Sequence, residues 1–368
     1  MSRTNIRGFI LMIAATALTI GAIMAVPTAA QVPQSDITLR VGNYGGLFTA
    51  TQRKYAGELF TRRTGIKVQY IDANPIDHLA KLIASKGREA PYDVVYLDDD
   101  VQPQAADAGV LQKINPAQLT NYKFLFNEAK DRGGYGPAMM FLDFGIIYNV
   151  EKFKAAGIPE PTTWESLWDP RLAGHIALPD PSNVNGRVLL VAASRLNGGS
   201  EKTLEKGIEK IAQLKVHSFW NSSAQAEALM SSGEVWALPL ISGRAWGLVD
   251  KGLPVKFVLP RDKEGHVGIG GWTTIDVVAG TKLSKEAHMY IDTVLDPLPQ
   301  LGQAYEIPYG PTNMLLGPVL AQYPEISKKF PTTVEALKRH YLPDWREYYR
   351  HHQKALDLWN RQIVAKRQ

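Results

Sequence analysis

The chain has 368 residues, of which 45% are hydrophobic, 9% aromatic and 21% charged, with a net charge of +5. This composition excludes a disordered, collagen-like or coiled-coil protein, and the length allows two compact units. There is no cysteine. That absence excludes disulfides, thiolate nucleophiles, cysteine-bound zinc, iron–sulfur clusters and a lipid-modified N-terminal cysteine.

The first 30 residues have the pattern of a secretory signal peptide. Arg3 and Arg7 precede an uncharged apolar stretch over residues 8–26, and small residues precede a cleavage site expected after Ala30. An uncleaved membrane helix is the alternative interpretation, and no later stretch reaches the ~18 apolar residues of a membrane span. Removing Arg3 and Arg7 lowers the net charge from +5 to +3. This charge is too small to indicate nucleic-acid or membrane binding, so we expect an exported, soluble protein.

Strands and helices alternate after this segment. Periodicity predicts strands over residues 39–43, 67–71 and 93–97, separated by helices over 50–64 and 76–85. This order predicts a parallel sheet within an α/β fold. Ligands bind open sheets of this kind at the carboxyl ends of the strands, which here are residues 43–46 and 98–100.

A second lobe is expected to begin near Phe144. Its predicted strands lie at residues 144–149, 175–178, 235–240, 255–259 and, after a glycine-rich turn over 268–271, 274–279. Its predicted helices lie at 164–168, 187–196, 202–214 and 224–232, and a further capped helix at 281–296. From Gln322 onward we expect helices whose aromatic residues clasp the outside of a lobe, namely Trp345, Tyr348, Tyr349 and Trp359.

Catalytic motifs are absent from the sequence. It has no phosphate-binding GxxxxGK[ST], no GxSxG elbow, no HExxH and no complete dinucleotide fingerprint, so we expect neither a cofactor nor a metal site. A hydrolase could still use a carboxylate pair drawn from Asp98, Asp99, Asp100 and Asp180. The simpler alternative is that the three consecutive aspartates cap a helix that starts at Val101.

Several segments, in order, resemble the spermidine/putrescine-binding family of periplasmic solute-binding proteins of ABC importers. They are VGNYGGLF at 41–48, FTRRTGIKVQY at 60–70, YDVVYLDDDVQPQAADAGVLQKI at 92–114, YGPAMMFLDFGIIYNVEKF at 135–153, TTWESLWDPRLAGHIALPD at 162–180, DKGLPVKFVLPRDKEG at 250–265 and IPYGPTN at 307–313. Each is weak alone, but together they cover nearly all of the chain after the signal segment.

The resemblance implies a type II periplasmic-binding-protein fold. Each of two α/β lobes would have a mixed, mainly parallel sheet flanked by helices, and crossing strands near 141–145 and 272–275 would form a hinge that closes on the ligand. We expect the signal peptide at 1–30, lobe 1 at 36–142 plus 274–320, lobe 2 at 143–273, and C-terminal helices at 321–368.

The resemblance also implies a ligand-binding site. The aromatic positions of the family fall on Tyr44, Trp272 and Tyr309, whose rings would stack on alkyl chains and attract ammonium groups. Packing in the core is the alternative for each ring. The acidic positions that bind amines in the family fall instead on Pro181, Val184 and Thr274, which carry no charge.

The charges of the expected site therefore differ from those of the family. Asp98 or Asp99 would meet a positive end of the ligand, and Arg244 a negative end by paired hydrogen bonds, unless Arg244 is simply a solvated surface residue. Asn183, Ser242 and Thr274 would supply orienting hydrogen bonds.

We therefore expect a monomeric periplasmic protein that is not an enzyme. It would capture a polyamine-like or zwitterionic amine and deliver it to ABC permease subunits in the inner membrane, without binding nucleic acid. A secreted hydrolase with an aspartate pair and a ferric-iron carrier are the alternatives. Iron sites need several converging tyrosine or histidine ligands, whereas Tyr348 and Tyr349 lie in the tail.

Overall fold

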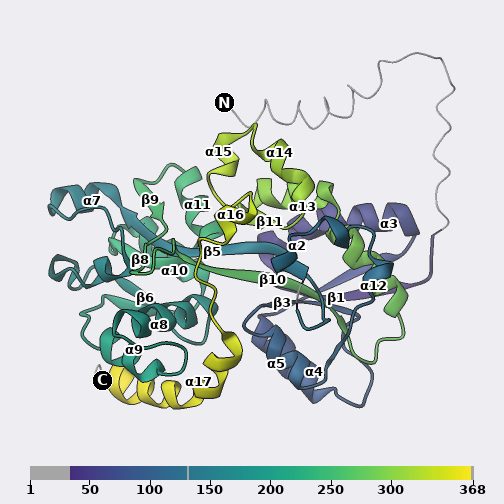
Figure 1. The fold of residues 1–368 in the computed structure, drawn as a ribbon, viewed down its shortest axis with the longest axis horizontal. Helices are drawn as coiled ribbons and strands as arrows, with labels where there is room; N and C mark the ends of the chain where they lie inside the picture. Colours follow the sequence, from purple (N-terminus) through teal and green to yellow (C-terminus); the bar gives the residue numbers. More distant parts are fainter. Residues whose placement is uncertain (1–33, 131, 366–368) are drawn as a thin grey trace.

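Two groups of helices and strands are joined by a pair of long crossing strands in the computed structural model (Figure 1). The structure describes residues 34–130 and 132–365, so the predicted signal peptide lies outside the described residues. None of the helices within these ranges combines the length and hydrophobicity needed to span a bilayer. The predicted α/β class and two-lobed architecture are confirmed, and we call the two groups the first and second lobes.

The first lobe contains the parallel strands that the alternating pattern predicts. Strand β1 (Thr38–Asn43) pairs in parallel with β2 (Lys67–Asp72) and with β3 (Val94–Asp98). Every residue of β3 is buried, because β3 lies between two neighbouring strands and is covered on both faces. The α-helices of this lobe are α2 (Gly46–Gln52), α3 (Glu58–Thr64), α4 (Pro75–Ala84), α5 (Gln102–Asp107), α6 (Asn127–Lys130), α12 (Ser284–Val294) and α13 (Pro297–Glu306).

The helix predicted over 50–64 is divided in the structure. A π-helical turn, Arg53–Gly57, separates α2 from α3. A Cβ atom on Gly57 would lie 2.5 Å from the Tyr70 hydroxyl of the neighbouring strand β2, so only glycine allows this close approach. The apolar periodicity predicted the helical segment but not this local change of helix type.

The second lobe contains a mixed arrangement of strands. Strands β6 (Ala177–Pro179) and β7 (Ser218–Trp220) pair in parallel, whereas β8 (Ala237–Ile241) and β9 (Val255–Val258) pair antiparallel with β5 (Ala138–Asn149). The helices are α7 (Val150–Ala155), α8 (Val184–Leu196), α9 (Leu204–Ile211), α10 (Ser223–Ser232) and α11 (Ser242–Asp250). The helix predicted at 164–168 is a 3₁₀ helix, Trp164–Trp168.

Strands β5 and β10 (Ile269–Val278) connect the lobes. The two strands pair antiparallel, with Ile269 opposite Phe144 at one end of the regular register and Thr273 opposite Met140 at the other. Every residue of both strands is buried. The sequence predicted strands only from residues 144 and 274, with a turn over 268–271. The structure instead places Gly270 and Gly271 within β10. Position 270 favours glycine because an added Cβ would lie 2.4 Å from the Phe141 ring of β5.

The main sheet has nine strands in the order β11-β5-β10-β3-β1-β2, with β4 on β10, and β8 and β9 on β5. Short strands β4 (Leu111–Gln112) and β11 (Gly310–Pro311) complete it. The parallel pairings lie within the individual lobes, whereas both crossing strands pair antiparallel with their neighbours. The mixed character of the predicted sheets is therefore confirmed, with more antiparallel pairing than the strand–helix alternation indicates.

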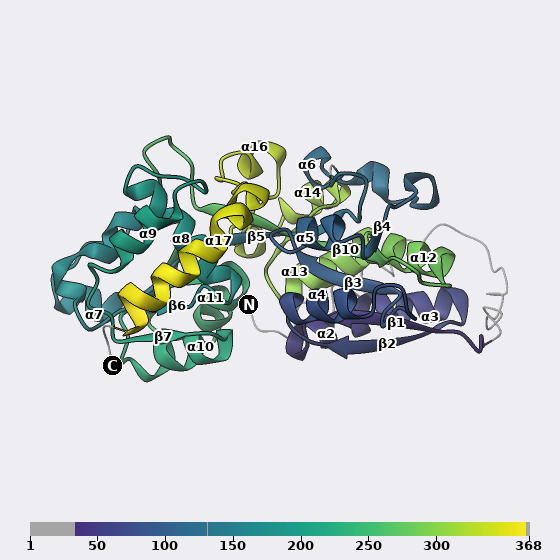
Figure 2. The same ribbon diagram turned by 90° about the horizontal axis from the view of Figure 1, so that it is seen from below.

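The C-terminal segment passes over the crossing strands between the lobes (Figure 1). Its helices are α14 (Gly317–Leu320), α15 (Pro324–Ser327), α16 (Val334–Leu337) and α17 (Trp345–Trp359). In Figure 2, α17 lies along the second lobe, where it packs against α9. Three of the four predicted clasping aromatic residues are buried, namely Trp345, Tyr348 and Trp359.

Close packing at Gly145 provides a test of the connection between the lobes. A Cβ on Gly145 would lie 2.2 Å from the Val258 carbonyl oxygen, so Gly145→Ala should destabilise the protein by about 1–3 kcal/mol or more. Gly247→Ala in helix α11 is the matched control, since no atom of the described residues outside its own helix turn lies within 4 Å of the added Cβ. It should be neutral or stabilising by up to about 1 kcal/mol. Urea unfolding measures both; equal effects would contradict the packing described for Gly145.

Candidate ligand-binding site

Three consecutive carboxylates lie at the carboxyl end of β3, where the sheet topology predicts a ligand site. Asp98 and Asp99 are each 8% exposed and Asp100 is fully buried. Helix α5 follows with Val101 at its N-cap position, and within the described residues no side chain caps it. Helix capping therefore does not explain these three residues. Their burial needs another source of stabilisation, because charged groups are costly to remove from water.

Asp98 lies beside Tyr44, the predicted aromatic residue at the end of β1. The Tyr44 hydroxyl donates a hydrogen bond of 2.7 Å to Asp98 Oδ1. Burial raises the pKa of Asp98 to about 7 and the charge of Asp100 acts in the same direction, while the Tyr44 hydrogen bond and Arg187 oppose the shift. Asp98 is thus partly protonated near neutral pH, and a nearby cation would favour its charged form.

Asp100 links the two lobes. Its Oδ2 atom accepts from the Nε atom of Arg187 in α8, and both side chains are almost completely buried. The Tyr349 hydroxyl of α17 donates to the same oxygen over 3.3 Å. Arg187 also donates to the backbone oxygen of Ser182 at 2.9 Å. Residues of the first lobe, the second lobe and helix α17 therefore all take part in this buried ion pair and its hydrogen bonds.

Tyr309 lies close to groups of both lobes. Its ring approaches Gly243 so closely that a Cβ there would lie 2.5 Å from it. Burial raises the pKa of Tyr309 to about 12; the positive charge of Arg244 opposes this, while Asp98 and Glu227 reinforce it. Tyr309 is thus within electrostatic range of both predicted charged residues, Asp98 and Arg244.

Arg244, predicted to meet a negative group, lies in the first turn of α11. Its side chain is 40% exposed and its Nη1 atom lies 3.5 Å from Glu227 Oε1 in α10. Glu227 also pairs with Lys251 at 3.5 Å. A ligand carboxylate at Arg244 would therefore compete with Glu227, whereas an ammonium group could approach Glu227 itself.

The three predicted hydrogen-bonding residues are placed differently. Asn183 is the N-cap of α8, where its Oδ1 atom accepts from Gly186 N at 3.3 Å, and its buried Nδ2 has no partner in the described part of the chain. Ser242 is fully buried, with Oγ 3.4 Å from the backbone N–H of Asp143. Thr274 is also fully buried, and its Oγ1 lies 2.7 Å from Asp276 Oδ2. Asn183 alone of the three retains a free buried donor.

Trp272 and Asp99 occupy different surroundings from Tyr44. The Trp272 ring packs on Phe141 at 4.7 Å between centroids, and the Arg132 guanidinium lies 5.1 Å from its centre. Burial raises the pKa of Asp99 well above its usual range, with Arg132 opposing the shift. Thr273 is the register partner of Asp98, and the side chains of adjacent strand residues point to opposite faces of the sheet. Trp272, next to Thr273, therefore lies on the face opposite to that of Asp98. The structure thus joins Tyr44 to Asp98 by a hydrogen bond, places Tyr309 within electrostatic range of Asp98, and leaves Trp272 packed against Phe141 of β5.

Sequence reasoning missed three charged or polar groups near this site, Arg187, Glu227 and Tyr349. Arg187 had a usable signal, because it is the one charged residue in the otherwise apolar and polar stretch 184–194. A buried arginine in such a helix needs an acidic partner. Glu227 and Tyr349 had no such signal, since each lies among other polar residues of its helix and reaches the site only through tertiary packing.

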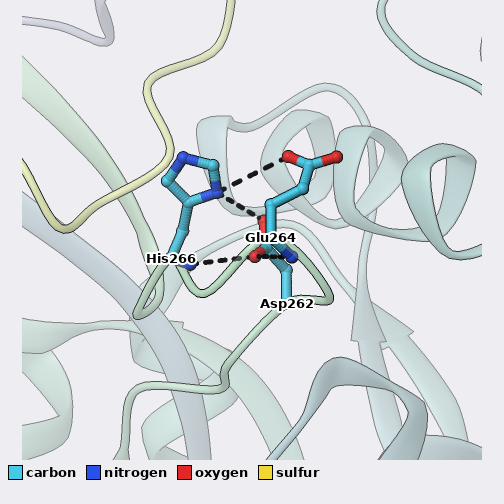
Figure 3. Close-up of side chains that lie close together, drawn as sticks. All are labelled: Asp262, Glu264 and His266. Carbon is cyan, nitrogen blue, oxygen red and sulfur yellow. Dashed lines mark hydrogen bonds and ion pairs between the residues drawn. The ribbon is translucent and has the colours of Figure 1, made fainter.

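A separate group of potential metal ligands lies in the loop after β9 (Figure 3). The ligand atoms of Asp262, Glu264 and His266 lie within 4.8 Å of one another. Arg195 pairs with both carboxylates, and His266 Nδ1 lies 2.8 Å from Asp262 Oδ2. The guanidinium of Arg195 also lies 3.7 Å from the centre of the Tyr341 ring. These interactions explain the cluster as a structural link between the loop, α8 and the C-terminal segment.

The profile of the bacterial extracellular solute-binding protein family matches residues 89–272, half of the chain. The chain belongs to this family. A similar curated protein is the spermidine/putrescine-binding periplasmic protein 1 of Haemophilus influenzae, which is 28% identical over 260 residues, covering 68% of this chain and 69% of that protein. The predicted resemblance to polyamine-binding proteins is therefore confirmed. These relatives are periplasmic transport proteins, and solute-binding proteins of ABC importers work with permease subunits.

Solved structures confirm the fold. A spermidine/putrescine ABC transporter substrate-binding protein from Streptococcus pneumoniae aligns with a TM-score of 0.70 at 19% identity, covering 89% of this chain and 99% of that chain. The Atu4243-GABA receptor aligns with a TM-score of 0.74 at 20% identity, covering 89% and 98%. Both similarities establish the periplasmic-binding-protein architecture of this family member.

The raised pKa of Asp98 predicts a pH dependence of stability. The folded protein holds this proton up to about pH 7, whereas an unfolded aspartate loses it near pH 4, so folding stability should fall as the pH rises between these values. In the wild type this fall in folding stability should be on the order of a few kcal/mol. The Asp98→Asn variant should lack it, because asparagine does not titrate in this range, although its side-chain oxygen can still accept the hydrogen bond from Tyr44.

Urea unfolding of the wild type and variant at pH 4, 5.5 and 7 measures this difference. Asp36→Asn is the matched control, because Asp36 is exposed and its replacement changes the net charge equally. Parallel stability profiles for wild type and Asp98→Asn would contradict the raised pKa.

Proposed function

We propose that this protein captures a small organic solute with an ammonium group, between Tyr44 and Asp98 of the first lobe and α11 of the second, for delivery to an ABC permease. Its curated relatives are named for polyamine binding, which supports an amine ligand. Those relatives are transport proteins rather than enzymes, so we infer that the ligand is released unchanged. The hydrolase and ferric-iron alternatives receive no support from these relatives.

The hydrogen-bonded pair of Tyr44 and Asp98 is the observation that carries this proposal. Asp98 is a poorly hydrated carboxyl group whose charged form is disfavoured by burial. An ammonium group would supply the missing positive charge, and the partly buried Tyr44 ring would contribute a cation–π interaction of about 0.5–2 kcal/mol. A neutral or anionic ligand would not relieve the electrostatic cost at Asp98.

The opposite end of the ligand would lie near Tyr309 and α11. Arg244 is suited to a carboxylate, and the free Nδ2 of Asn183 could donate to one. This arrangement favours a zwitterion, such as an amino acid whose charges are separated by a short alkyl chain. Glu227 supports a second candidate ligand, a diamine, because it offers a second carboxylate within 3.5 Å of Arg244.

Putrescine and 4-aminobutyrate distinguish these two ligand classes, because each has a four-carbon chain with an ammonium group at one end. The other end is a second ammonium group in putrescine and a carboxylate in 4-aminobutyrate. We expect 4-aminobutyrate to bind more tightly than putrescine. Arg244→Gln should weaken 4-aminobutyrate binding by about tenfold or more and leave putrescine binding equal or tighter. Asp98→Asn should weaken the binding of both, and succinate should not bind.

Isothermal titration calorimetry of the purified protein measures these affinities. Arg62→Gln, an exposed first-lobe arginine, is the control for Arg244→Gln, and Asp36→Asn is the control for Asp98→Asn. Selective putrescine binding that Arg244→Gln leaves unchanged would replace the zwitterion with the diamine. Unchanged binding of both compounds to Asp98→Asn would contradict the proposed site.

A further inference from the structure

A cavity of about 470 Å³ lies beside the crossing strand β5, on residues other than those of the candidate site. Its walls come from β9, residues 160–162, Trp246 of α11 and the C-terminal segment 328–340. Asp143 of β5 also lines it. None of the residues predicted from sequence to bind the ligand lines this cavity, so it is a second candidate site.

The cavity carries an excess of uncompensated positive charge. Arg261, Lys328 and Arg339 line it, and none of their side chains forms an ion pair or hydrogen bond within the described ranges of the chain. The remaining charges are compensated. Lys329 lies 2.7 Å from Asp250, His340 lies 2.7 Å from Asp143, and Glu160 lies 3.8 Å from Lys256.

The other walls are apolar and include one unused donor. Trp246 and Phe257 lie with ring centroids 6.1 Å apart, and the buried ring of Phe330 faces the same space. The Trp246 Nε1 atom is buried without an acceptor in the described part of the chain. A buried N–H group without a partner is costly, so an acceptor supplied by a ligand would be favourable here.

We propose that this cavity binds a small organic anion with an apolar body, such as an aromatic carboxylate. The volume lies within the range of about 300–1,000 Å³ that is usual for small-molecule sites. The carboxylate would form charge-assisted hydrogen bonds with Arg261 or Arg339, and the ring would pack on Trp246 and Phe257. A cation of the same shape would meet unfavourable charge.

Such a ligand would act on the connection between the lobes. The C-terminal segment contacts the second lobe through Lys329 and Asp250, and the first lobe through Lys338 and Glu128 at 3.3 Å. An anion held between Arg339 and the β9 region would join this segment more firmly to the second lobe, next to β5. Binding to the folded state should therefore raise the unfolding temperature.

Benzoate is the probe for this site, and benzylamine is its matched cation. We expect benzoate to bind saturably by isothermal titration calorimetry and to raise the unfolding temperature more than benzylamine does. The double variant Arg261→Gln/Arg339→Gln should weaken benzoate binding by about tenfold or more, and Trp246→Phe should weaken it several-fold. The two arginines are exposed, so the double variant should fold normally, as thermal unfolding will show.

Two controls separate this site from the candidate amine site. Lys338→Gln removes a neighbouring cation that does not line the cavity, and it should leave benzoate binding unchanged. Asp98→Asn should also leave it unchanged. The absence of saturable benzoate binding, equal binding of benzylamine, or full benzoate binding by the double variant would each overturn the proposal.

Discussion

Burial of three consecutive carboxylates at the end of β3 is the constraint on which the arrangement around the candidate site depends. The three carboxyl groups have different electrostatic surroundings. Asp100 pairs with Arg187 of the other lobe, and Asp99 lies within electrostatic range of Arg132. Asp98 receives a hydrogen bond from Tyr44 and lies within electrostatic range of Arg187, but it forms no ion pair of its own in the described part of the chain. The site is therefore electrostatically incomplete at Asp98, and a cationic ligand would complete it.

The same group of residues connects ligand binding with the contact between the lobes. Strands β5 and β10 join the lobes covalently, whereas the ion pair of Asp100 and Arg187 joins them through side chains. Asp98 and Asp100 repel each other when both are charged, and this repulsion adds to burial in raising the pKa of Asp98. An ammonium group beside Asp98 would reduce this repulsion and thus support the inter-lobe ion pair. At the proposed site, the contact between the lobes and the charge of the ligand would therefore be linked at one strand end.

Local patterns in the sequence were sufficient to predict the parallel strands of the first lobe and the position of Tyr44 and Asp98 at adjacent strand ends. They underestimated β5 and β10, because Gly270 and Gly271 indicate a turn until the close approach of Phe141 is known. The role of Arg187 required knowledge of which helix faces β3. The surroundings of Trp272 depend on strand register, since a shift of one residue exchanges the two faces of a strand.

Proton release on amine binding tests the central claim about Asp98 most directly. Because its raised pKa leaves Asp98 partly protonated near pH 7, a bound ammonium group should drive it to the carboxylate. Titration calorimetry with the better-binding amine, in phosphate and in MOPS at pH 7, should show release of a fraction of a proton per ligand. Asp98→Asn should release almost none. The same binding heat in both buffers for the wild type would show that Asp98 does not change its charge, and would contradict this account.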